Sequence, residues 1–212
     1  ASAHLDASYQ DVKEHSPDSI RVVANLSEQG SIDALFDRTR DELGRVDILV
    51  NNAATQTPCP FLEVAASDWD LIMDVNLKAP FLCSQRAARM MRVQGSGKII
   101  NIASLQSKRA FQNGLAYGAS KGGVDQMTRA MAEAWSKDGI SCNAIAPGFF
   151  PTELTAPVFK DKQLFADNAA KTAIGRNGEL QDLEGITIFL SSSASDYITG
   201  QTIFVDGGYT AK

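Results

Sequence analysis

Residues 98–121 have the sequence KIINIASLQSKRAFQNGLAYGASK, and this stretch decides the predicted fold. Its isoleucines predict a buried strand over residues 98–103, because short β-branched runs are typical of strands covered on both faces. Tyr117 begins an amphipathic run that predicts a helix to about residue 137. A strand, a short loop and a helix in this order form the repeating unit of parallel α/β sheets.

The same alternation extends outward in both directions along the chain. The predicted helices cover residues 5–12, 32–43, 67–93, 117–137 and 180–190, and the predicted strands cover residues 20–24, 46–50, 98–103, 140–145 and 202–205. This pattern predicts an α/β fold of the Rossmann type, a doubly wound parallel sheet in a single domain over residues 1–212. Residues 151–176 are the least regular part, and we expect them to form a mobile flap.

Composition excludes several classes of function. The net charge of −5 argues against nucleic-acid partners and an anionic membrane surface, and no stretch approaches the ~18 apolar residues of a membrane span. The three widely spaced cysteines, Cys59, Cys83 and Cys142, predict reduced thiols in the cytoplasm and fit neither a disulfide framework nor a metal site. His4 and His15 both lie near the start, which argues against a histidine-dependent hydrolase.

In parallel sheets, ligands bind beyond the carboxyl ends of the strands. The residues that follow the predicted strands are therefore the first candidates for a site. They are Asn25, residues 51–54, Ser104 and residues 147–152.

Tyr117 and Lys121 lie four residues apart at the start of a predicted helix and therefore share one face. A neighbouring ammonium favours the phenolate and lowers the pKa of a tyrosine, which suits it to proton transfer. Ser104 precedes Tyr117 by thirteen positions, and its hydroxyl is able to hold a carbonyl oxygen. Taken separately, the pair is also explained as an exposed helix face, and Ser104 as a helix cap. Asn76 interrupts an apolar helix face, where a buried asparagine requires hydrogen-bond partners.

Together, these features resemble the short-chain dehydrogenase/reductase family over most of the chain. The N-N-A-G motif of that family matches residues 51–54, with Ala54 in place of the last glycine. Its P-G-x-x-x-T segment matches residues 147–152, whose backbone and hydroxyl hold the nicotinamide carboxamide in the family. The resemblance implies the catalytic residues Asn76, Ser104, Tyr117 and Lys121.

The resemblance also implies the cofactor and the chemistry. Hydride would pass between NAD or NADP and a small-molecule carbonyl or secondary alcohol, and no metal is implied. Ser104 would hold the carbonyl oxygen, Tyr117 would donate the proton, and Lys121 would lower the phenol pKa and bind the cofactor ribose. The implied cofactor-binding residues are Asn25, Leu26, Asn51, Asn52, Ala53, Ala54, Tyr117, Lys121, Pro147, Gly148, Phe150 and Thr152. Asn76 would position a water that links Lys121 to solvent.

One departure from the family is large. Its glycine-rich T-G-x-x-x-G-x-G loop has no counterpart here, and the first glycine of the chain is Gly30. We therefore expect an N-terminal strand-helix-strand unit to be missing from this chain, with the first strand of the family central in the sheet. That unit carries the residue that selects NAD or NADP, so the sequence leaves the choice open.

The sequence gives weaker evidence on the substrate and the oligomeric state than on the family. Residues 104–121, residues 149–153 and the C-terminal tail resemble the gluconate 5-dehydrogenase subgroup, which acts on sugar acids. Lys108 and Arg109 have two equally good interpretations. They bind a carboxylate or phosphate of the substrate, or they are solvated cations on an exposed loop. A 3-oxoacyl-carrier-protein reductase and a non-catalytic dinucleotide-binding protein remain alternatives. The resemblance also implies a homodimer or homotetramer that pairs through the helices over residues 67–93 and 117–137.

Overall fold

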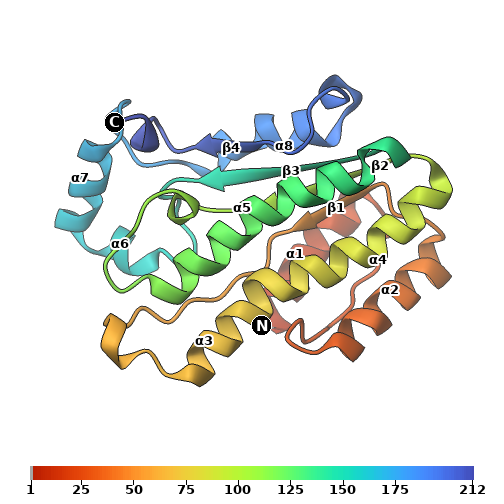
Figure 1. Ribbon diagram of the computed structural model, residues 1–212, viewed down its shortest axis with the longest axis horizontal. Coiled ribbons are helices and arrows are strands. Elements are labelled where there is room, and N and C mark those ends of the chain that lie inside the picture. Colours follow the sequence, from red (N-terminus) through yellow and green to blue (C-terminus); the bar gives the residue numbers. More distant parts are fainter. Residues whose placement is uncertain (1) are drawn as a thin grey trace.

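A four-stranded parallel sheet forms the centre of the computed structural model, which describes residues 2–212 and the side chains from residue 5 onward. The strands are β1 (Ile48–Asn51), β2 (Gly97–Ile102), β3 (Ile140–Pro147) and β4 (Thr202–Val205), and they lie side by side in that order. All three neighbouring pairs are parallel. The carboxyl ends of the strands therefore meet at one edge of the sheet (Figure 1).

Helices cover both faces of this sheet because successive side chains of a strand point to opposite sides. Ile99 packs against α4 (Ala79–Gln94) and α5 (Leu115–Trp135) on one face. Its neighbour Ile100 packs on the opposite face against Leu190 of α8 (Glu184–Ser191). The predicted doubly wound parallel sheet is thus confirmed.

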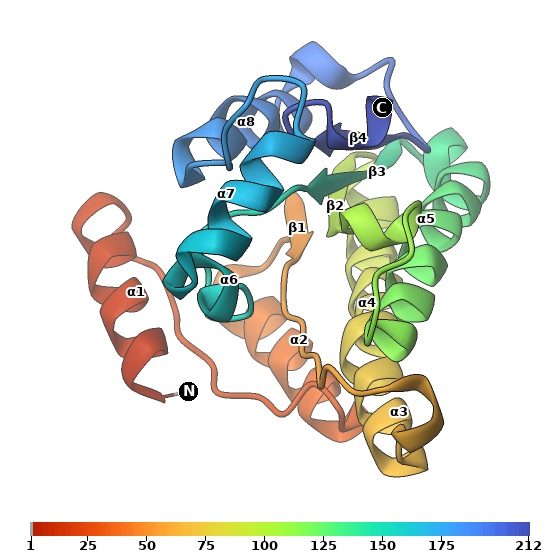
Figure 2. The same ribbon diagram turned by 90° about the vertical axis from the view of Figure 1, so that its left-hand side faces the viewer.

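The remaining helices surround this core. They are α1 (Ser2–His15), α2 (Gln29–Leu43), α3 (Ala66–Met73), α6 (Ala156–Lys160) and α7 (Lys162–Lys171). Helix α2 packs on α4, whereas α1 lies at the margin of the molecule (Figure 2). No helix within residues 2–212 has both the length and the apolar character needed to cross a membrane.

The long helix expected over residues 67–93 forms, but with a change of winding in its middle. A π-helical segment, Asp74–Lys78, joins α3 to α4 without a break. The helix begins at Ala66, and no side-chain cap is present at Ala65. A π-helical turn inserts an extra residue, and such turns are frequent at functional sites.

The strand predicted for residues 20–24 is wrong, because this segment is extended but assigned to no strand. Its β-branched residues favour a strand, but a strand also needs a neighbour for its N–H and C=O groups. Within residues 2–212, no strand lies beside it. The side chain of Val23 is accordingly 76% exposed.

The irregular segment over residues 151–176 contains more structure than the sequence indicated. Helices α6 and α7 occupy much of it, and the Asp161 carboxylate caps α7 by accepting hydrogen bonds from Gln163 N and Leu164 N. We call residues 151–161 the flap, because they follow β3 at the carboxyl edge of the sheet. The mobility expected for residues 151–176, of which this flap is the first part, stays a prediction.

Candidate active site

Ser104 follows β2 directly, at the carboxyl edge of the sheet. Its hydroxyl accepts a hydrogen bond from the backbone N–H of Gln106 at 3.1 Å and so caps the short 3₁₀ turn Leu105–Ser107. The cap fixes the position of the hydroxyl oxygen. Ser104 also forms a side-chain hydrogen bond with Tyr117, which acts to lower the pKa of that phenol.

Tyr117 and Lys121 lie on the first two turns of α5, next to the end of β2. The Lys121 ammonium donates a hydrogen bond to the carbonyl of Ile102 at 2.6 Å and lies 5.7 Å from the centre of the Tyr117 ring. Lys121 is only 2% exposed, and burial lowers its pKa to about 8. An ammonium has three donors, so two remain for other acceptors after the bond to Ile102.

Burial raises the pKa of the Tyr117 phenol, and the hydrogen bond with Ser104 opposes this shift. The sequence predicted the opposite direction, through the charge of Lys121. Desolvation is the larger of the two effects, because removing a charged phenolate from water costs more than the Ser104 hydrogen bond restores. Tyr117 is therefore a neutral acid at neutral pH in this structure, ready to donate a proton.

Asn76 lies in the π-helical segment and is completely buried. Its side-chain oxygen accepts a hydrogen bond from the backbone N–H of Thr55 at 2.8 Å, and its amide donates to the carbonyl of the same residue at 2.9 Å. The amide also donates to the Ser120 hydroxyl at 3.2 Å. Asn76 thus ties the loop after β1 to the helix that carries Tyr117 and Lys121.

Ser120 is a site residue that the sequence reasoning missed. Its hydroxyl is fully buried and donates to the carbonyl of Tyr117 at 2.7 Å while it accepts from Asn76. A serine between Tyr117 and Lys121 is unremarkable as a sequence signal. Its role depends on the approach of a distant helix, which the local pattern does not reveal.

A second network of hydrogen-bonded polar side chains links β1 and β2 to α4 and α5. Asn51 donates to the Ser84 hydroxyl at 2.9 Å and to the Asn101 side-chain oxygen at 2.8 Å. Asn101 in turn donates to the Thr128 hydroxyl at 2.9 Å. The Asn51 side chain therefore bonds within the interior, and the cofactor contact expected of Asn51 stays a prediction.

The other cofactor-binding residues expected from the sequence lie in the loop after β1 and in the turn before α2. Asn52 and Ala53 are exposed, and Ala54 is partly exposed. Asn25 closes a turn at the start of α2, where its side-chain oxygen accepts from the N–H and hydroxyl of Ser27. Leu26 packs into the cluster between α2 and α4. A cofactor contact of Leu26 would thus come from its backbone.

The segment after β3 carries the remaining cofactor candidates. Pro147 ends the strand, and Gly148 donates to the carbonyl of Val205, the last residue of β4. Phe150 is buried, with its ring so close to Gly178 that a side chain there would clash. Thr152 is exposed, and its hydroxyl lies 2.9 Å from that of Thr155.

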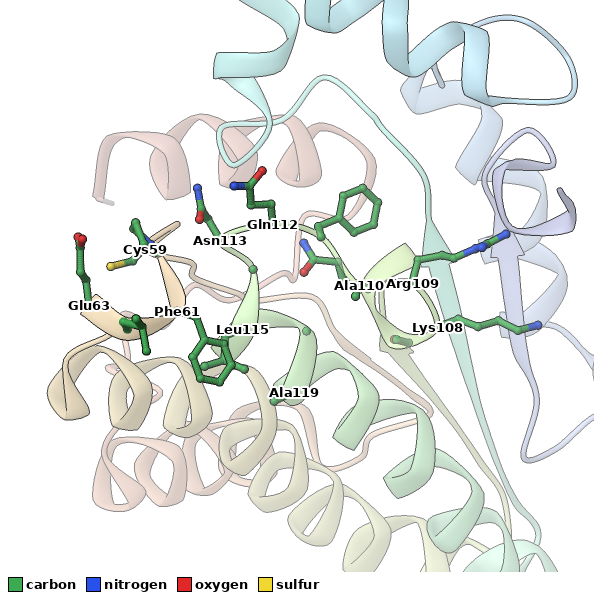
Figure 3. A pocket seen from close by; sticks show the side chains of 17 residues that line it. Cys59, Phe61, Glu63, Lys108, Arg109, Ala110, Gln112, Asn113, Leu115 and Ala119 are labelled. Carbon is green, nitrogen blue, oxygen red and sulfur yellow. The ribbon is translucent and has the colours of Figure 1, made fainter.

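A cavity of about 900 Å³ opens beside this site, lined by residues 59–63 and by parts of residues 106–119 (Figure 3). Figure 3 shows the ends of Lys108 and Arg109 extending away from the Cys59–Glu63 side of the cavity. The Lys108 ammonium lies 5.6 Å from the centre of the Phe204 ring, and Arg109 donates to the carbonyl of Lys212. Both cations therefore have partners already.

Among the side chains that the structure describes, those of residues 5–212, no cluster of histidine, cysteine or acidic groups is suited to a metal ion. The site contains the Tyr117 phenol, the buried Lys121 amine and the hydroxyls of Ser104 and Ser120 at the end of β2 and along α5, together with the Asn76 carboxamide from the π-helical segment. These groups are suited to moving a proton to or from an oxygen atom, with a separate molecule as the source of electrons.

Comparisons with known proteins agree with this chemistry. A family model described as "Enoyl-(Acyl carrier protein) reductase" matches residues 2–210. The 2-dehydro-3-deoxy-D-gluconate 5-dehydrogenase of Escherichia coli is 45% identical over 197 residues, which cover 91% of this chain and 77% of the relative. The gluconate 5-dehydrogenase of Gluconobacter oxydans is 40% identical over 171 residues, covering 81% of this chain and 67% of the relative.

A solved structure shows the same arrangement. It is a gluconate 5-dehydrogenase from Burkholderia cenocepacia in complex with NADP and tartrate. It superposes with a TM-score of 0.88 at 40% sequence identity, covering 90% of this chain and 75% of that chain. At this level of identity, the likeness extends from fold to family.

Proposed function

The chain belongs to the short-chain dehydrogenase/reductase family of NAD(P)-dependent oxidoreductases, and we propose that it interconverts a carbonyl and a hydroxyl group at C5 of a gluconate-type sugar acid. The observation that carries the proposal is the convergence of Ser104, Tyr117 and Lys121 at the end of β2. The sugar acid follows from the relatives, whose names specify gluconate or a dehydrated gluconate oxidised at C5.

The residues present fit a nicotinamide dinucleotide. Lys121 is a buried ammonium with one of its three donors engaged, which suits it to hold the hydroxyls of a ribose. Residues 52–54 and the Pro147–Thr152 segment border the same edge of the sheet, where parallel folds bind dinucleotides. Asn25 and Leu26 would contact the adenosine half from the turn before α2. The choice between NAD and NADP stays open, and the assay described below decides it.

A bound nicotinamide would supply or accept the hydride, and the residues of the chain would bind the substrate oxygen atom and transfer its proton. Ser104 holds the carbonyl oxygen through its hydroxyl, whose position its cap fixes. Tyr117 donates its phenolic proton to that oxygen during reduction and takes it back during oxidation. Lys121 stabilises the resulting phenolate by its positive charge. Asn76 holds the site together through Thr55 and Ser120.

The direct test measures nicotinamide absorbance at 340 nm with the natural protein. The substrates are 5-keto-D-gluconate for reduction, and gluconate and 2-dehydro-3-deoxy-D-gluconate for oxidation, each with NAD(H) and NADP(H). We expect turnover with at least one of these sugar acids and a clear preference for one cofactor. Absence of turnover with all of them would contradict the substrate class.

A 3-oxoacyl thioester is included in the same panel, because the alternative activity is reduction of an acyl-carrier substrate. The net charge of −5 gives little support to docking of an acidic carrier protein. Faster turnover of the thioester than of every sugar acid would favour that alternative. Cofactor binding without turnover of any substrate would favour a non-catalytic dinucleotide-binding protein.

We also propose that the protein acts in the cytoplasm as a homodimer or homotetramer, with residues 1–212 forming one cofactor-binding domain. Cys59, Cys83 and Cys142 are free thiols, a state that a reducing compartment maintains. A hollow between α4 and α5 exposes part of Phe81, which supports pairing through these helices. Light scattering at micromolar concentration tests the assembly, and a monomer mass would contradict it.

A further inference from the structure

Gln56 crosses from the loop after β1 to the flap. Its side-chain amide donates a hydrogen bond to the backbone carbonyl of Leu154 at 3.0 Å, although the two residues lie 98 positions apart. Gln56 also lines a narrow cleft together with Asn113 and Tyr117. The bond therefore joins the loop after β1 to the flap beside a cleft that Tyr117 also lines.

The loop end of this bond is held firmly. Thr55, the residue before Gln56, has both its N–H and its carbonyl bound by the Asn76 side chain, at 2.8 and 2.9 Å. Asn76 is fully buried, so water does not compete for these bonds. Gln56 thus projects from a backbone that the interior of the molecule fixes in place.

The flap end of the bond belongs to a small cooperative unit. The Thr155 hydroxyl donates to the carbonyl of Phe150, accepts a hydrogen bond from the Thr152 N–H at 3.0 Å and lies 2.9 Å from the Thr152 hydroxyl. Leu154 lies between Thr152 and Thr155, so a displacement of its carbonyl moves the whole turn. Thr152 itself is exposed, whereas Phe150 is buried and holds the base of the flap.

We propose that Gln56 is a positioning residue, a latch that holds the flap closed across the entrance of the site and transmits the position of Asn76 to Thr152. The donor matters because the group that it holds is a carbonyl, which accepts hydrogen bonds and donates none. The latch opens by the loss of a single neutral hydrogen bond, which allows ligands to enter and leave.

This inference rests on the proposed function, and the test separates the two. Gln56→Met keeps the length of the side chain and removes the donor, whereas Gln56→Glu places a carboxylate against the Leu154 carbonyl. The matched control is Gln201→Met, since Gln201 also donates to a backbone carbonyl, that of Thr199, at 3.1 Å on the exposed surface. Each variant is assayed for kcat and KM, and amide hydrogen exchange is followed in residues 151–161.

For Gln56→Met we expect exchange in the flap to rise about three- to tenfold, because one neutral hydrogen bond is lost. KM for the sugar acid or the cofactor should rise by a similar factor, with kcat changed less than twofold. Gln56→Glu should give at least as large an effect, and Gln201→Met should match the unaltered protein in both measurements.

Unchanged flap exchange and unchanged KM in both Gln56 variants would overturn the latch. A fall in kcat without a change in flap exchange would also overturn it, because Gln56 would then act in the chemistry. The exchange measurement needs no turnover, so it tests the latch even if the sugar-acid assay fails.

Discussion

The two sides of β1 differ sharply. On its inner side β1 pairs with β2, and the interior there is closed, with Ile99 and Ile100 each 1% exposed. Its other side is the edge of the sheet, where within residues 2–212 no further strand is paired. The side chains of Ile48 and Val50 in β1 are 44% and 43% exposed.

The proposed proton-transfer groups and the proposed dinucleotide contacts lie on different sides of this strand, and the described residues support the two sets to different extents. The proposed proton-transfer groups Asn76, Ser104, Tyr117 and Lys121 lie on the inner side, where contacts among residues 55–121 hold them. The candidate dinucleotide contacts Asn25 and residues 52–54 lie toward the open edge of β1. A rigid interior therefore supports the acid and base groups, while the adenosine side has fewer supporting contacts.

The largest expected effect concerns the inner side. Tyr117→Phe removes the phenolic proton and should lower kcat about 10²- to 10⁴-fold, the usual contribution of a general acid. Nicotinamide absorbance in the sugar-acid assay measures it. Tyr197→Phe is the matched control, because the Tyr197 side chain is fully exposed, and it should keep normal activity. Turnover of Tyr117→Phe within tenfold of the unaltered enzyme would contradict the assigned acid.

A second comparison, between two buried asparagines, separates a contribution to stability from a contribution to catalysis. Asn76 and Asn143 are both buried asparagines that bind a distant backbone, and Asn143 holds the carbonyl of Ile198 and the N–H of Gln201. Either change to alanine leaves buried polar groups unpaired and should cost about 2–4 kcal/mol of unfolding free energy. Urea unfolding measures this loss.

Activity should distinguish these two variants. Asn76→Ala should lower turnover at least tenfold, whereas Asn143→Ala should retain most of it at a temperature where both are folded. Equal losses of activity would mean that the Asn76 clamp serves stability alone.

The third prediction uses the buried ammonium. Burial lowers the pKa of Lys121 to about 8 in the folded state, while the pKa of a lysine in the unfolded state is about 10.4. Between these values the folded state binds fewer protons than the unfolded state, so unfolding free energy rises as pH increases from 8 to 10. Below pH 8 the full penalty persists, about 3 kcal/mol from the size of the shift.

Lys121→Met removes this penalty together with the hydrogen bond to Ile102. We expect the variant to be inactive yet more stable at pH 7 by about 1–2 kcal/mol, with the advantage shrinking toward pH 10. Urea titrations from pH 7 to 10 measure the gap. Lys137→Met, on the exposed surface, serves as the control. A constant gap across this range would show that the Lys121 pKa is unshifted.

The smallest effect concerns the open edge itself. Ile48→Ala should cost less than about 0.5 kcal/mol, as for a surface position, whereas Ile99→Ala should cost about 2–5 kcal/mol. Thermal and urea unfolding of the natural protein measure both. A loss of several kcal/mol for Ile48→Ala would show that another segment covers this edge.

Much of the architecture was predictable because it depends on local pattern. The predicted strand over residues 202–205 matches β4, and the helix predicted to stop before Gly44 does so, with Gly44 in a left-handed cap at φ 73°. The strand predicted over residues 20–24 failed for the opposite reason. β-Branched residues favour a strand, but a partner strand decides whether it forms.

The candidate site divides in the same way. The spacing of Tyr117 and Lys121 is fixed by the geometry of one helix, so the sequence predicted their shared face. The direction of the Tyr117 pKa was mispredicted, because burial depends on every surrounding element. The partners of Asn51 come from two other elements, which no local pattern specifies.

The sequence by itself determined the alternation of strands and helices, the candidate proton-transfer groups and the family resemblance, because these depend on residue type and on short spacings. The tertiary structure alone decided which of these groups are buried, which hydrogen bonds hold them, and that the amide of Gln56 meets the carbonyl of Leu154. Burial and long-range hydrogen bonds arise when segments far apart in the chain pack together, and the cost of leaving polar groups unpaired then selects their partners.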